Sequence, residues 1–387
     1  MRPSEVVRAN AAAGSARFGG PAERTGRSDR VCPMPTTPSR SLTVAQHRIG
    51  QDHRPFVVAE MSGNHNGDLG RALAIVDMIA ESGAQSVKLQ TYRADTITID
   101  ADGPAFRVSE GHELWGGKNL YQLYEEAHTP WEWHAPIFER AREHGLVPFS
   151  SPFDDTAVDL LEDLDAPLYK IASLEIGDIP LLRRVARTGK PVVLSTGAAN
   201  ISDVDLAVRT IRAEGNDQIV VLGCTSSYPA SPAESNLRTI PVLRDTFDVV
   251  AGLSDHTMGI GVAVAAVALG AAVVEKHVTL ARSDGGVDSD FSLEPQELAA
   301  LAAETERAWL ALGSVHVGPT AGEAESRRLR RSLFVVEDVR AGDEVTSANV
   351  RSIRPAGGLE PVHLDTVLGR TFSTDVVRGT PLTWDLV

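Results

Sequence analysis

Residues 56–90 read FVVAEMSGNHNGDLGRALAIVDMIAESGAQSVKLQ, and this stretch contains the pattern of a strand, a helix and a second strand. The first run, FVVAE, is short and apolar, as expected for a strand of a buried parallel sheet. Apolar residues then recur at the spacing of an α-helix from Leu69 to Ala80, and Gly83 is placed to end that helix. The stretch therefore predicts one β-α-β unit.

The same unit repeats along the chain, and eight segments have the pattern of buried strands. They are FVVAE (56–60), SVKLQ (86–90), LVPFS (146–150), YKIAS (169–173), VVLST (192–196), VVLGC (220–224), AGLSD (251–255) and VVEKH (273–277). Eight such units over about 250 residues predict a (β/α)8 TIM barrel, an α/β fold. A doubly wound open sheet is the alternative, but no glycine fingerprint follows the first strand and the strand count favours closure.

The 387 residues are enough for two or three domains. Residues 1–41 have no periodic apolar pattern, and we expect a disordered or misassigned N-terminal extension there. Residues 42–312 are assigned to the barrel, 313–326 to a linker and 327–387 to a small β-rich domain. The last segment contains three short β-like runs, Ser332–Val336, Val350–Ile353 and Pro381–Trp384.

One insertion interrupts the repeat, between Thr91 and Pro130. It contains several aromatic residues, among them Trp115 and Tyr124. An insertion after a barrel strand lies on the catalytic face, so a lid or a wall of the substrate site is one interpretation. Packing of the aromatic side chains onto the barrel is an equal alternative.

The composition excludes several classes of protein. There are 37 Lys and Arg residues against 52 Asp and Glu, for a formal net charge of −15. This balance disfavours binding to nucleic acid or to an anionic membrane surface. Two cysteines exclude a disulfide-stapled scaffold and a cysteine-rich zinc domain. The sequence has no run of 18 apolar residues and no apolar signal segment, and we expect a cytoplasmic protein.

Only five of the basic residues are lysines, namely Lys88, Lys118, Lys170, Lys190 and Lys276. A chain that otherwise uses arginine has either kept these lysines at random or placed them where a compact charge is needed. Three of the five, Lys88, Lys170 and Lys276, belong to strand segments. The C-terminal ends of barrel strands face one site, and the neighbours of Lys88 and Lys170 make these two lysines the candidates for ligand binding.

Hydroxyl and amide side chains accompany Lys88 and Lys170 at the strand ends. The set comprises Gln90, Ser151, Ser173, Ser195, Ser226 and Ser254. Lysines combined with hydroxyls bind a compact oxyanion such as phosphate. A Schiff-base lysine, as in a sugar aldolase, is the chemical alternative.

Histidines and carboxylates occupy the same strand ends. His256 and His277 close neighbouring strands and could bind a divalent transition metal, although a strand-end histidine is also a common packing residue. Glu60 and Glu175 are candidate general acid/base groups. Asp288 could orient a polar substrate or serve only as a turn residue.

Seven motifs resemble those of the sialic acid synthase family of phosphoenolpyruvate-dependent synthases. The motifs are AEMSGNHNGD (59–68), VKLQTYRADT (87–96), YKIASLEIGD (169–178), LSTG (194–197), GLSDHT (252–257), EKHVTL (275–280) and RRSLFVVEDVRAGD (330–343). The resemblance implies a barrel followed by an antifreeze-like (SAF) domain, and the condensation of phosphoenolpyruvate with an acylamino sugar. The pseudaminic acid synthase branch is the most similar, on AEMSGNHN, TYRADT, LWGG (114–117) and TPWEWH (129–134).

The resemblance also implies roles for individual residues. His256 and His277 would hold Mn2+ or Mg2+, and Glu60 would lie beside the reacting carbons. The two lysines and the hydroxyl and amide set would bind phosphoenolpyruvate. The acceptor sugar would meet Glu175, Asp288, Asn64, Tyr228 and, from the SAF domain of the other subunit of a homodimer, Arg354.

Two positions depart from the family pattern. Ser226 stands where some members have Asn, and Ala356 replaces a Gly in the loop after Arg354. The acceptor of the most similar branch is 2,4-diacetamido-2,4,6-trideoxy-L-altrose, and N-acetylneuraminate or legionaminate synthesis is the alternative within the family. A Schiff-base aldolase or a non-catalytic sugar-binding protein is the alternative from another class.

Overall fold

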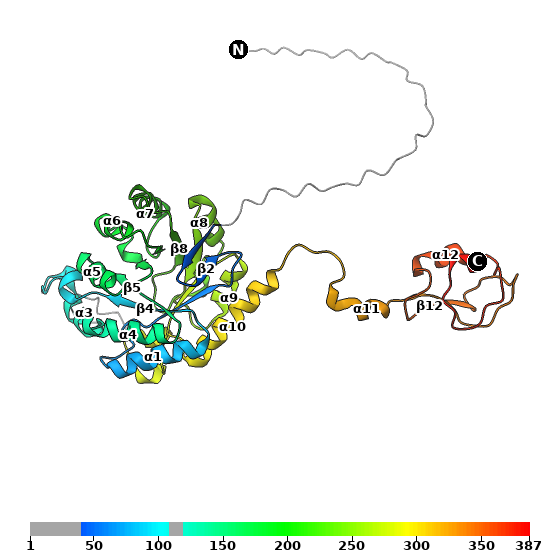
Figure 1. The fold of residues 1–387 in the computed structure, drawn as a ribbon, viewed down its shortest axis with the longest axis horizontal. Helices are drawn as coiled ribbons and strands as arrows, with labels where there is room; N and C mark the ends of the chain where they lie inside the picture. Colours follow the sequence, from blue (N-terminus) through cyan, green and yellow to red (C-terminus); the bar gives the residue numbers. More distant parts are fainter. Residues whose placement is uncertain (1–39, 108–118) are drawn as a thin grey trace, which may run out of the picture. The chain divides into compact units, whose positions relative to one another are not determined.

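The computed structural model describes residues 40–107 and 119–387 (Figure 1). Two compact units make up the chain, with the boundary between Leu312 and Gly313. The N-terminal unit contains the barrel and the C-terminal unit a small β domain. The extension expected over residues 1–41 lies almost wholly outside the described residues.

Among the described residues, eight parallel strands close into a barrel in the order β10-β3-β4-β5-β6-β7-β8-β9. They are β3 (Phe56–Glu60), β4 (Ser86–Thr91), β5 (Val147–Pro152), β6 (Tyr169–Ile171), β7 (Val192–Ser195), β8 (Ile219–Cys224), β9 (Val250–Ser254) and β10 (Val273–His277). The eight predicted strands are confirmed, and the closed order excludes the open-sheet alternative.

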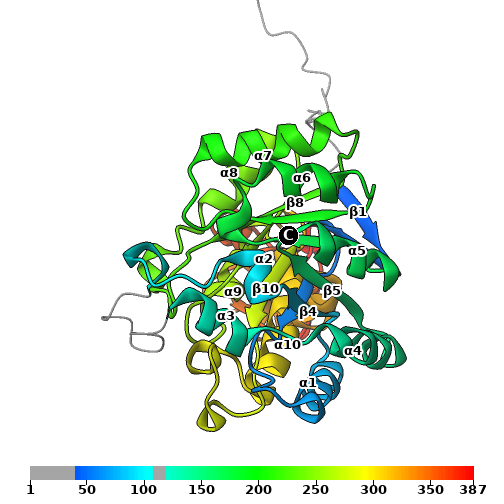
Figure 2. The same cartoon turned by 90° about the vertical axis from the view of Figure 1, so that its left-hand side faces the viewer.

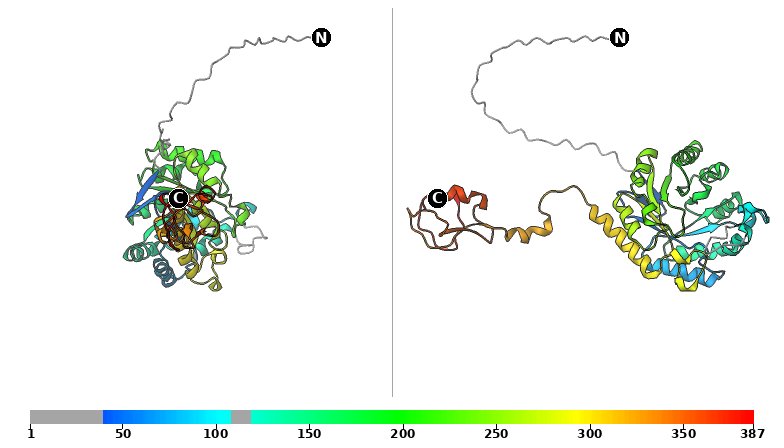
Figure 3. Two further views of the ribbon diagram at one scale, coloured as in Figure 1. Left: turned by 90° about the vertical axis from the view of Figure 1, so that its right-hand side faces the viewer. Right: turned by 180° about the vertical axis from the view of Figure 1, so that it is seen from behind.

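Helices cover the outside of the barrel (Figure 3). They are α1 (Leu69–Ser82), α4 (Trp131–Glu143), α5 (Asp155–Asp163), α6 (Ile179–Ala186), α7 (Ile201–Ala213), α8 (Thr239–Phe247), α9 (Gly261–Ala268) and α10 (Pro295–Leu312). The Asp68 side chain caps α1 by accepting from the Arg71 N–H, and Gly83 ends it with a φ of 84°, as the sequence predicts. Within the described ranges, no helix has the length and apolarity needed to cross a lipid bilayer.

Side chains alternate along each strand between the barrel interior and the layer beneath the helices. In β3, Val57 and Ala59 belong to the helix-covered core, whereas Phe56 and Val58 belong to a second apolar cluster inside the barrel. The next inward residue of this strand is Glu60. The interior is therefore apolar in its lower part and becomes charged toward the C-terminal ends of the strands.

An N-terminal hairpin, which the sequence did not predict, closes the apolar end of the barrel. Its strands β1 (Ser41–Val44) and β2 (His47–Gly50) pair antiparallel. The buried side chains of Leu42, Val44 and Ile49 belong to the same interior cluster as the first residues of several barrel strands. The hairpin thus completes the apolar packing below the charged part.

The insertion after β4 carries α2 (Ala94–Ile97) and α3 (Leu120–Ala127). Both helices lie at one end of the barrel (Figures 1 and 2). Trp115, one of the expected aromatic residues, lies outside the described residues. Tyr124 of α3 packs edge-on against Tyr92, and Tyr92 packs on Phe153, which follows β5, so aromatic side chains of the insertion contact the barrel.

The C-terminal unit has its own small core. The antiparallel pair of β11 (Ser332–Val335) and β12 (Val350–Ile353) matches two of the three predicted runs. The third run contributes a single bridge, between Pro381 and Phe334, instead of a strand. The helices of this unit are α11 (Ala324–Arg328) and α12 (Leu364–Val367). Because α11 begins at Ala324, the stretch assigned to the linker is partly helical.

The hairpin packing predicts a difference between two isoleucine substitutions. Ile49 is 1% exposed in the interior cluster, whereas Ile201 is 54% exposed at the start of α7. Ile49→Ala should lower the free energy of unfolding by about 2–4 kcal/mol because it leaves a cavity. Ile201→Ala should change it by less than about 0.5 kcal/mol. Urea denaturation of both variants measures this, and equal stability of the two would show that the hairpin adds nothing.

Candidate functional site

Polar and charged side chains line the upper part of the barrel interior. In β10, Val273 belongs to the apolar interior cluster, and Glu275 and His277 follow it at a spacing of two residues. The same alternation brings inward the candidates Lys88, Ser151, Lys170, Ser195 and Ser254. Together with Glu60 of β3, seven strands thus contribute to one site, as the barrel architecture predicts.

Two lysines and two glutamates form a buried ionic cluster at this level. Lys88 Nζ lies 2.5 Å from Glu60 Oε2 and 3.7 Å from Glu275 Oε2. Lys170 Nζ lies 3.9 Å from Glu275 Oε1 and donates a hydrogen bond to the carbonyl of Ile171. The four charged side chains are at most 7% exposed, so their fields act in a poorly hydrated interior.

Burial and neighbouring charges compete in setting the pKa values of this cluster. Burial raises the pKa of Glu60 to about 7, against the attraction of Lys88. Burial also disfavours the charged form of Glu275, but Lys170 and Lys88 outweigh it and the pKa of Glu275 is lowered. The two glutamates outweigh burial at Lys88, whose pKa is raised. At Lys170 burial prevails and the pKa is lowered.

Buried hydroxyl groups lie beside the ionic cluster. Ser254 Oγ donates to Glu275 at 2.9 Å, and Lys88 donates to Ser151 Oγ at 3.4 Å. The Oγ atoms of Ser195 and Ser226 are buried and have no hydrogen-bond partner among the described residues. A buried hydroxyl without a partner is unfavourable, so these two atoms indicate where a polar ligand would bind.

Gly197 lies where two of the hydroxyls converge. Its N–H donates to Ser173 Oγ at 3.1 Å, and a Cβ at this position would lie 2.0 Å from Ser226 Oγ. Ser173 and Ser226, which follow β6 and β8, therefore meet at the backbone that follows β7. A side chain at residue 197 would fill this space.

His256 and His277 lie side by side, with ring centroids 5.4 Å apart. Nδ1 of His256 lies 2.9 Å from the carbonyl of Thr225, so this nitrogen donates and Nε2 is left as an acceptor. Nδ1 of His277 is buried and has no hydrogen-bond partner in the part of the chain that the structure describes. Burial lowers the pKa of His277 well below its ordinary value. Both rings thus offer a nitrogen for a metal ion.

The surroundings of the two histidines define which kind of ion would fit. Tyr228 packs on His256 at a centroid distance of 4.4 Å, and Phe291 lies 5.1 Å from His277. Over residues 40–107 and 119–387, no three His, Cys, Asp or Glu side chains form a metal-binding cluster. The residues present fit an ion that takes two protein ligands and completes its coordination with water and substrate.

Asp288 faces the same histidine from the loop after β10. Its Oδ2 accepts a hydrogen bond from Ser62 Oγ and lies 3.7 Å from Nδ1 of His277. Burial raises the pKa of Asp288, although Ser62 opposes this effect. Glu175 follows β6, and burial raises its pKa as well. Two carboxylates therefore border the opening of the barrel.

The amide group of Asn64 is partly used in hydrogen bonds within the protein. Its Nδ2 donates to the carbonyl of Val278 and to Ser292 Oγ, each at 2.9 Å. Its Oδ1 is buried without a partner among the described residues. Asn64 can therefore offer a ligand an acceptor but no donor.

Lys276 belongs to a strand but was not among the site candidates, and it lies apart from the ionic cluster. Lys276 points away from the barrel interior, and its Nζ donates to Asp255 at 2.9 Å and to the carbonyl of Thr257 at 2.7 Å. Its position between two inward residues explains this direction. Gln90, a candidate, lies two residues after Lys88 on β4 and pairs in register with Ser151, so its half-buried side chain is on the inward face. Arg354 belongs to the C-terminal unit.

Three residues of the site were not among the sequence candidates. They are Glu275 in the ionic cluster, Ser62 beside Asp288, and Cys224, whose Sγ lies 3.9 Å from Nδ1 of His256. Glu275 and Cys224 occupy inward positions of predicted strands, so the two-residue alternation would have found them. Ser62 lies in the turn after β3, where no periodic signal exists.

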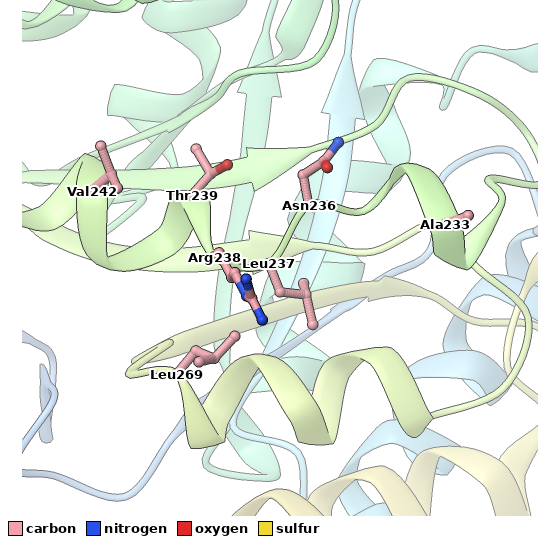
Figure 4. A pocket seen from close by; sticks show the side chains of 7 residues that line it. All are labelled: Ala233, Asn236, Leu237, Arg238, Thr239, Val242 and Leu269. Carbon is pink, nitrogen blue, oxygen red and sulfur yellow. The ribbon is translucent and has the colours of Figure 1, made fainter.

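A cavity of about 530 Å³ lies elsewhere on the barrel unit (Figure 4). It is lined by residues near the start of α8, including Leu237 and Arg238, and by Leu269 at the end of α9. None of the candidate residues named above lines this cavity. It is therefore distinct from the site inside the barrel.

Comparisons with known proteins agree with this architecture. The NeuB family model matches residues 75–317, and the SAF domain model matches residues 330–387. A Helicobacter pylori protein named pseudaminic acid synthase is 41% identical over 332 residues, which cover 86% of this chain and 97% of that protein. A Campylobacter jejuni protein named N,N'-diacetyllegionaminic acid synthase is 33% identical over 321 residues, or 82% and 95% of the two chains.

A solved structure shows the same fold. The N-acetylneuraminic acid synthetase of Leptospira borgpetersenii matches with a TM-score of 0.66 at 32% identity, and the match covers 74% of this chain and 95% of that chain. The family model spans most of the barrel, and the relatives are matched over nearly their whole length. The chain therefore belongs to the NeuB family, and a SAF domain follows the barrel in the sequence.

Proposed function

We propose that this protein is a pseudaminic acid synthase, which condenses phosphoenolpyruvate with 2,4-diacetamido-2,4,6-trideoxy-L-altrose and releases phosphate. The observation that carries the proposal is the pair of buried lysines beside hydroxyls without partners and two neighbouring histidines. The identity of 41% to a pseudaminic acid synthase, against 33% to a legionaminic acid synthase, supports this acceptor. The cytoplasmic location stays a prediction.

Phosphoenolpyruvate carries a phosphate and a carboxylate, and the barrel interior has donors for both. Lys88 and Lys170 would supply charge-assisted hydrogen bonds, and Ser195 and Ser226 would supply their unpaired hydroxyls. The remaining members of the hydroxyl and amide set lie at the same strand ends. In binding, Lys88 would exchange part of its contact with Glu60 for contact with the ligand.

His256 and His277 would hold the divalent ion, Mn2+ or Mg2+, that the family resemblance implies. Such an ion supplies Lewis-acid polarisation of the sugar aldehyde when it is bound. Glu175, Asp288 and Asn64 would bind the acceptor through its hydroxyl and amide groups. Tyr228, which packs on His256, would border the same sugar.

The reaction forms one C–C bond and breaks one C–O bond. C3 of phosphoenolpyruvate attacks the aldehyde carbon, the aldehyde oxygen takes up a proton, and C2 becomes cationic. The carboxylates of Glu60 and Glu275 are positioned to stabilise that charge. Water oriented by Glu60 adds to C2 and gives up one proton, which balances the proton taken up by the aldehyde oxygen. The tetrahedral intermediate then loses phosphate through cleavage of the bond between C2 and the bridging oxygen, and the proton of its C2 hydroxyl leaves with the phosphate. The product is a nine-carbon 2-keto sugar acid.

We also infer a homodimer in which Arg354 of one subunit completes the barrel site of the other. Arg354 is exposed on the C-terminal unit and lies in the segment RSIRPAGG (351–358) that carries the family resemblance. A guanidinium would add a fixed positive charge to a site that binds a carboxylate and a phosphate.

Phosphate release with three acceptor sugars tests the reaction and its acceptor. The altrose derivative named above should give a higher kcat/KM than N-acetylmannosamine or the legionaminate precursor, because the chain is most similar to the pseudaminate branch. With 18O in the bridging position of phosphoenolpyruvate, the label should leave with the phosphate. Retention of the label in the keto acid would contradict C–O cleavage, and a preference for another sugar would contradict the acceptor.

Mixing two inactive variants tests the metal ligand and the dimer together. His256→Ala and Arg354→Ala should each lower kcat by about 100-fold or more, because each removes a charge-stabilising element. In a statistical mixture, half of the dimers would contain one intact site of two, so about a quarter of the wild-type activity should return. The assay uses chains that were unfolded and refolded together, with each variant refolded alone as control. No recovery in verified mixed dimers would contradict the shared site.

A further inference from the structure

Three aromatic rings lie together beyond the C-terminal ends of β4 and β5. Tyr92 follows β4 directly, and Phe153 follows β5. The rings of Tyr92 and Phe153 meet edge-on at a centroid distance of 5.2 Å, and the ring of Tyr124 from α3 meets Tyr92 at 5.7 Å. These three residues are called the aromatic wall here. Because it stands on the strands that carry Lys88 and Ser151, the wall borders the opening of the site.

The helix that carries Tyr124 is held at both ends. At its start, Asn119 Oδ1 accepts from the Gln122 N–H at 2.8 Å. At its end, the carbonyl of Ala127 lies 3.2 Å from the position of a Cβ on Gly63, in the loop after β3. The helix is therefore capped at its start and lies against the loop after β3 at its end, and the ring of Tyr124 packs on Tyr92.

The helix that carries Tyr124 ends close to the segment of Asp288, which the proposed function assigns to the sugar. A Cβ on Gly63 would lie 3.2 Å from the carbonyl of Ala127, at the end of that helix, and in contact with the side chain of Val287, the residue before Asp288. Burial raises the pKa of Tyr124, and the nearby Glu175 carboxylate adds to this effect. Burial and the charge of Asp288 act on Tyr92 in the same direction. Tyr92 is 4% exposed, whereas Tyr124 keeps part of its surface accessible. An accessible aromatic face thus stands beside groups that would bind sugar hydroxyls.

We propose that Tyr124, supported from behind by the buried Tyr92, determines which acceptor is used, by packing on the acyl and deoxy methyl groups of an N-acylated 6-deoxy amino sugar. The inference rests on the proposed function, whose acceptor carries two acetamido groups and a C6 methyl group. An aromatic face buries such apolar groups favourably, whereas a hydroxyl held against it loses water without gaining a partner. Glu175 and Asp288 orient the polar side of the sugar, and the ring of Tyr124 contacts its apolar side.

Steady-state kinetics of Tyr124→Ala and Tyr124→Phe, followed by phosphate release, test this role. In Tyr124→Ala, the KM for the diacetamido-trideoxy sugar should rise about 10- to 100-fold, the range expected for apolar contacts in a binding pocket. The KM for phosphoenolpyruvate should stay within about twofold, because the wall does not belong to the lysine and hydroxyl set. Tyr124→Phe keeps the ring and should retain the wild-type KM for the sugar. Glu125→Ala, the next residue on the same helix and an exposed one, is the control and should behave as wild type.

The possible outcomes separate this inference from the proposed function. An unchanged sugar KM in folded Tyr124→Ala would overturn the inference, and so would an equal rise in the KM values of both substrates. If the KM for the sugar rose as much in Tyr124→Phe as in Tyr124→Ala, the role would belong to the hydroxyl group, and the inference would also be overturned. If Tyr124→Ala does not fold, Tyr124→Gln replaces it with the same expected rise. A wild-type protein that releases no phosphate with any of the three acceptors would instead contradict the proposed function.

Discussion

The pairing of two lysines with two glutamates inside the barrel is the constraint on which the rest of the site depends. Lys88 lies between Glu60 and Glu275, and Lys170 approaches Glu275 from the other side. Charges buried to this degree are tolerated only when they are paired and hydrogen-bonded. The closed barrel provides this, because residues far apart in the chain reach the same level of the interior from neighbouring strands. The apolar cluster and the hairpin below it keep water from the opposite end.

The ionic cluster also explains how an acidic protein could bind an anion. Residues 55–326 carry a formal net charge of −21, so the field of the whole unit does not attract a phosphate. Charges beyond about 8 Å are screened at physiological salt, and the immediate contacts decide the affinity. The candidates for those contacts are two lysines and two hydroxyls that have no hydrogen-bond partner among the described residues. The positions of Lys88 and Lys170 in the barrel interior, and not the net charge of the chain, would provide the positive charge for anion binding.

Most of the barrel could be predicted from the sequence because its signals are local. The strand FVVAE, the helix face from Leu69 to Ala80 and the terminating Gly83 each follow from the spacing within one short segment. The hairpin at residues 41–50 was missed because its two strands have four residues each, and they are stabilised by contacts with distant strand starts. The same limit applies to α11, which occupies part of a polar stretch that reads as a linker.

The inward side chains of the site can be predicted from the two-residue alternation along each strand. Selection by residue type omitted Glu275, the inward residue next to Lys276, whose own side chain faces outward to Asp255. On β10, Glu275 lies two residues after the inward Val273 and Lys276 lies three residues after it, so the alternation turns their side chains to opposite faces. The partner of Asp288 could not be predicted, because Ser62 reaches it from a turn 226 residues away in the chain.

Binding of phosphoenolpyruvate to two lysine variants tests the central claim most directly. Lys170 lies in the ionic cluster, whereas Lys190 pairs with Glu162 at 2.6 Å, apart from that cluster. By isothermal titration without sugar, Lys170→Met should weaken binding about 10-fold or more, the effect of losing one hydrogen bond to a charged group. Lys190→Met should leave the Kd within about twofold. Equal affinities of folded Lys170→Met and wild-type protein would contradict the assignment of the buried lysines to the substrate anion.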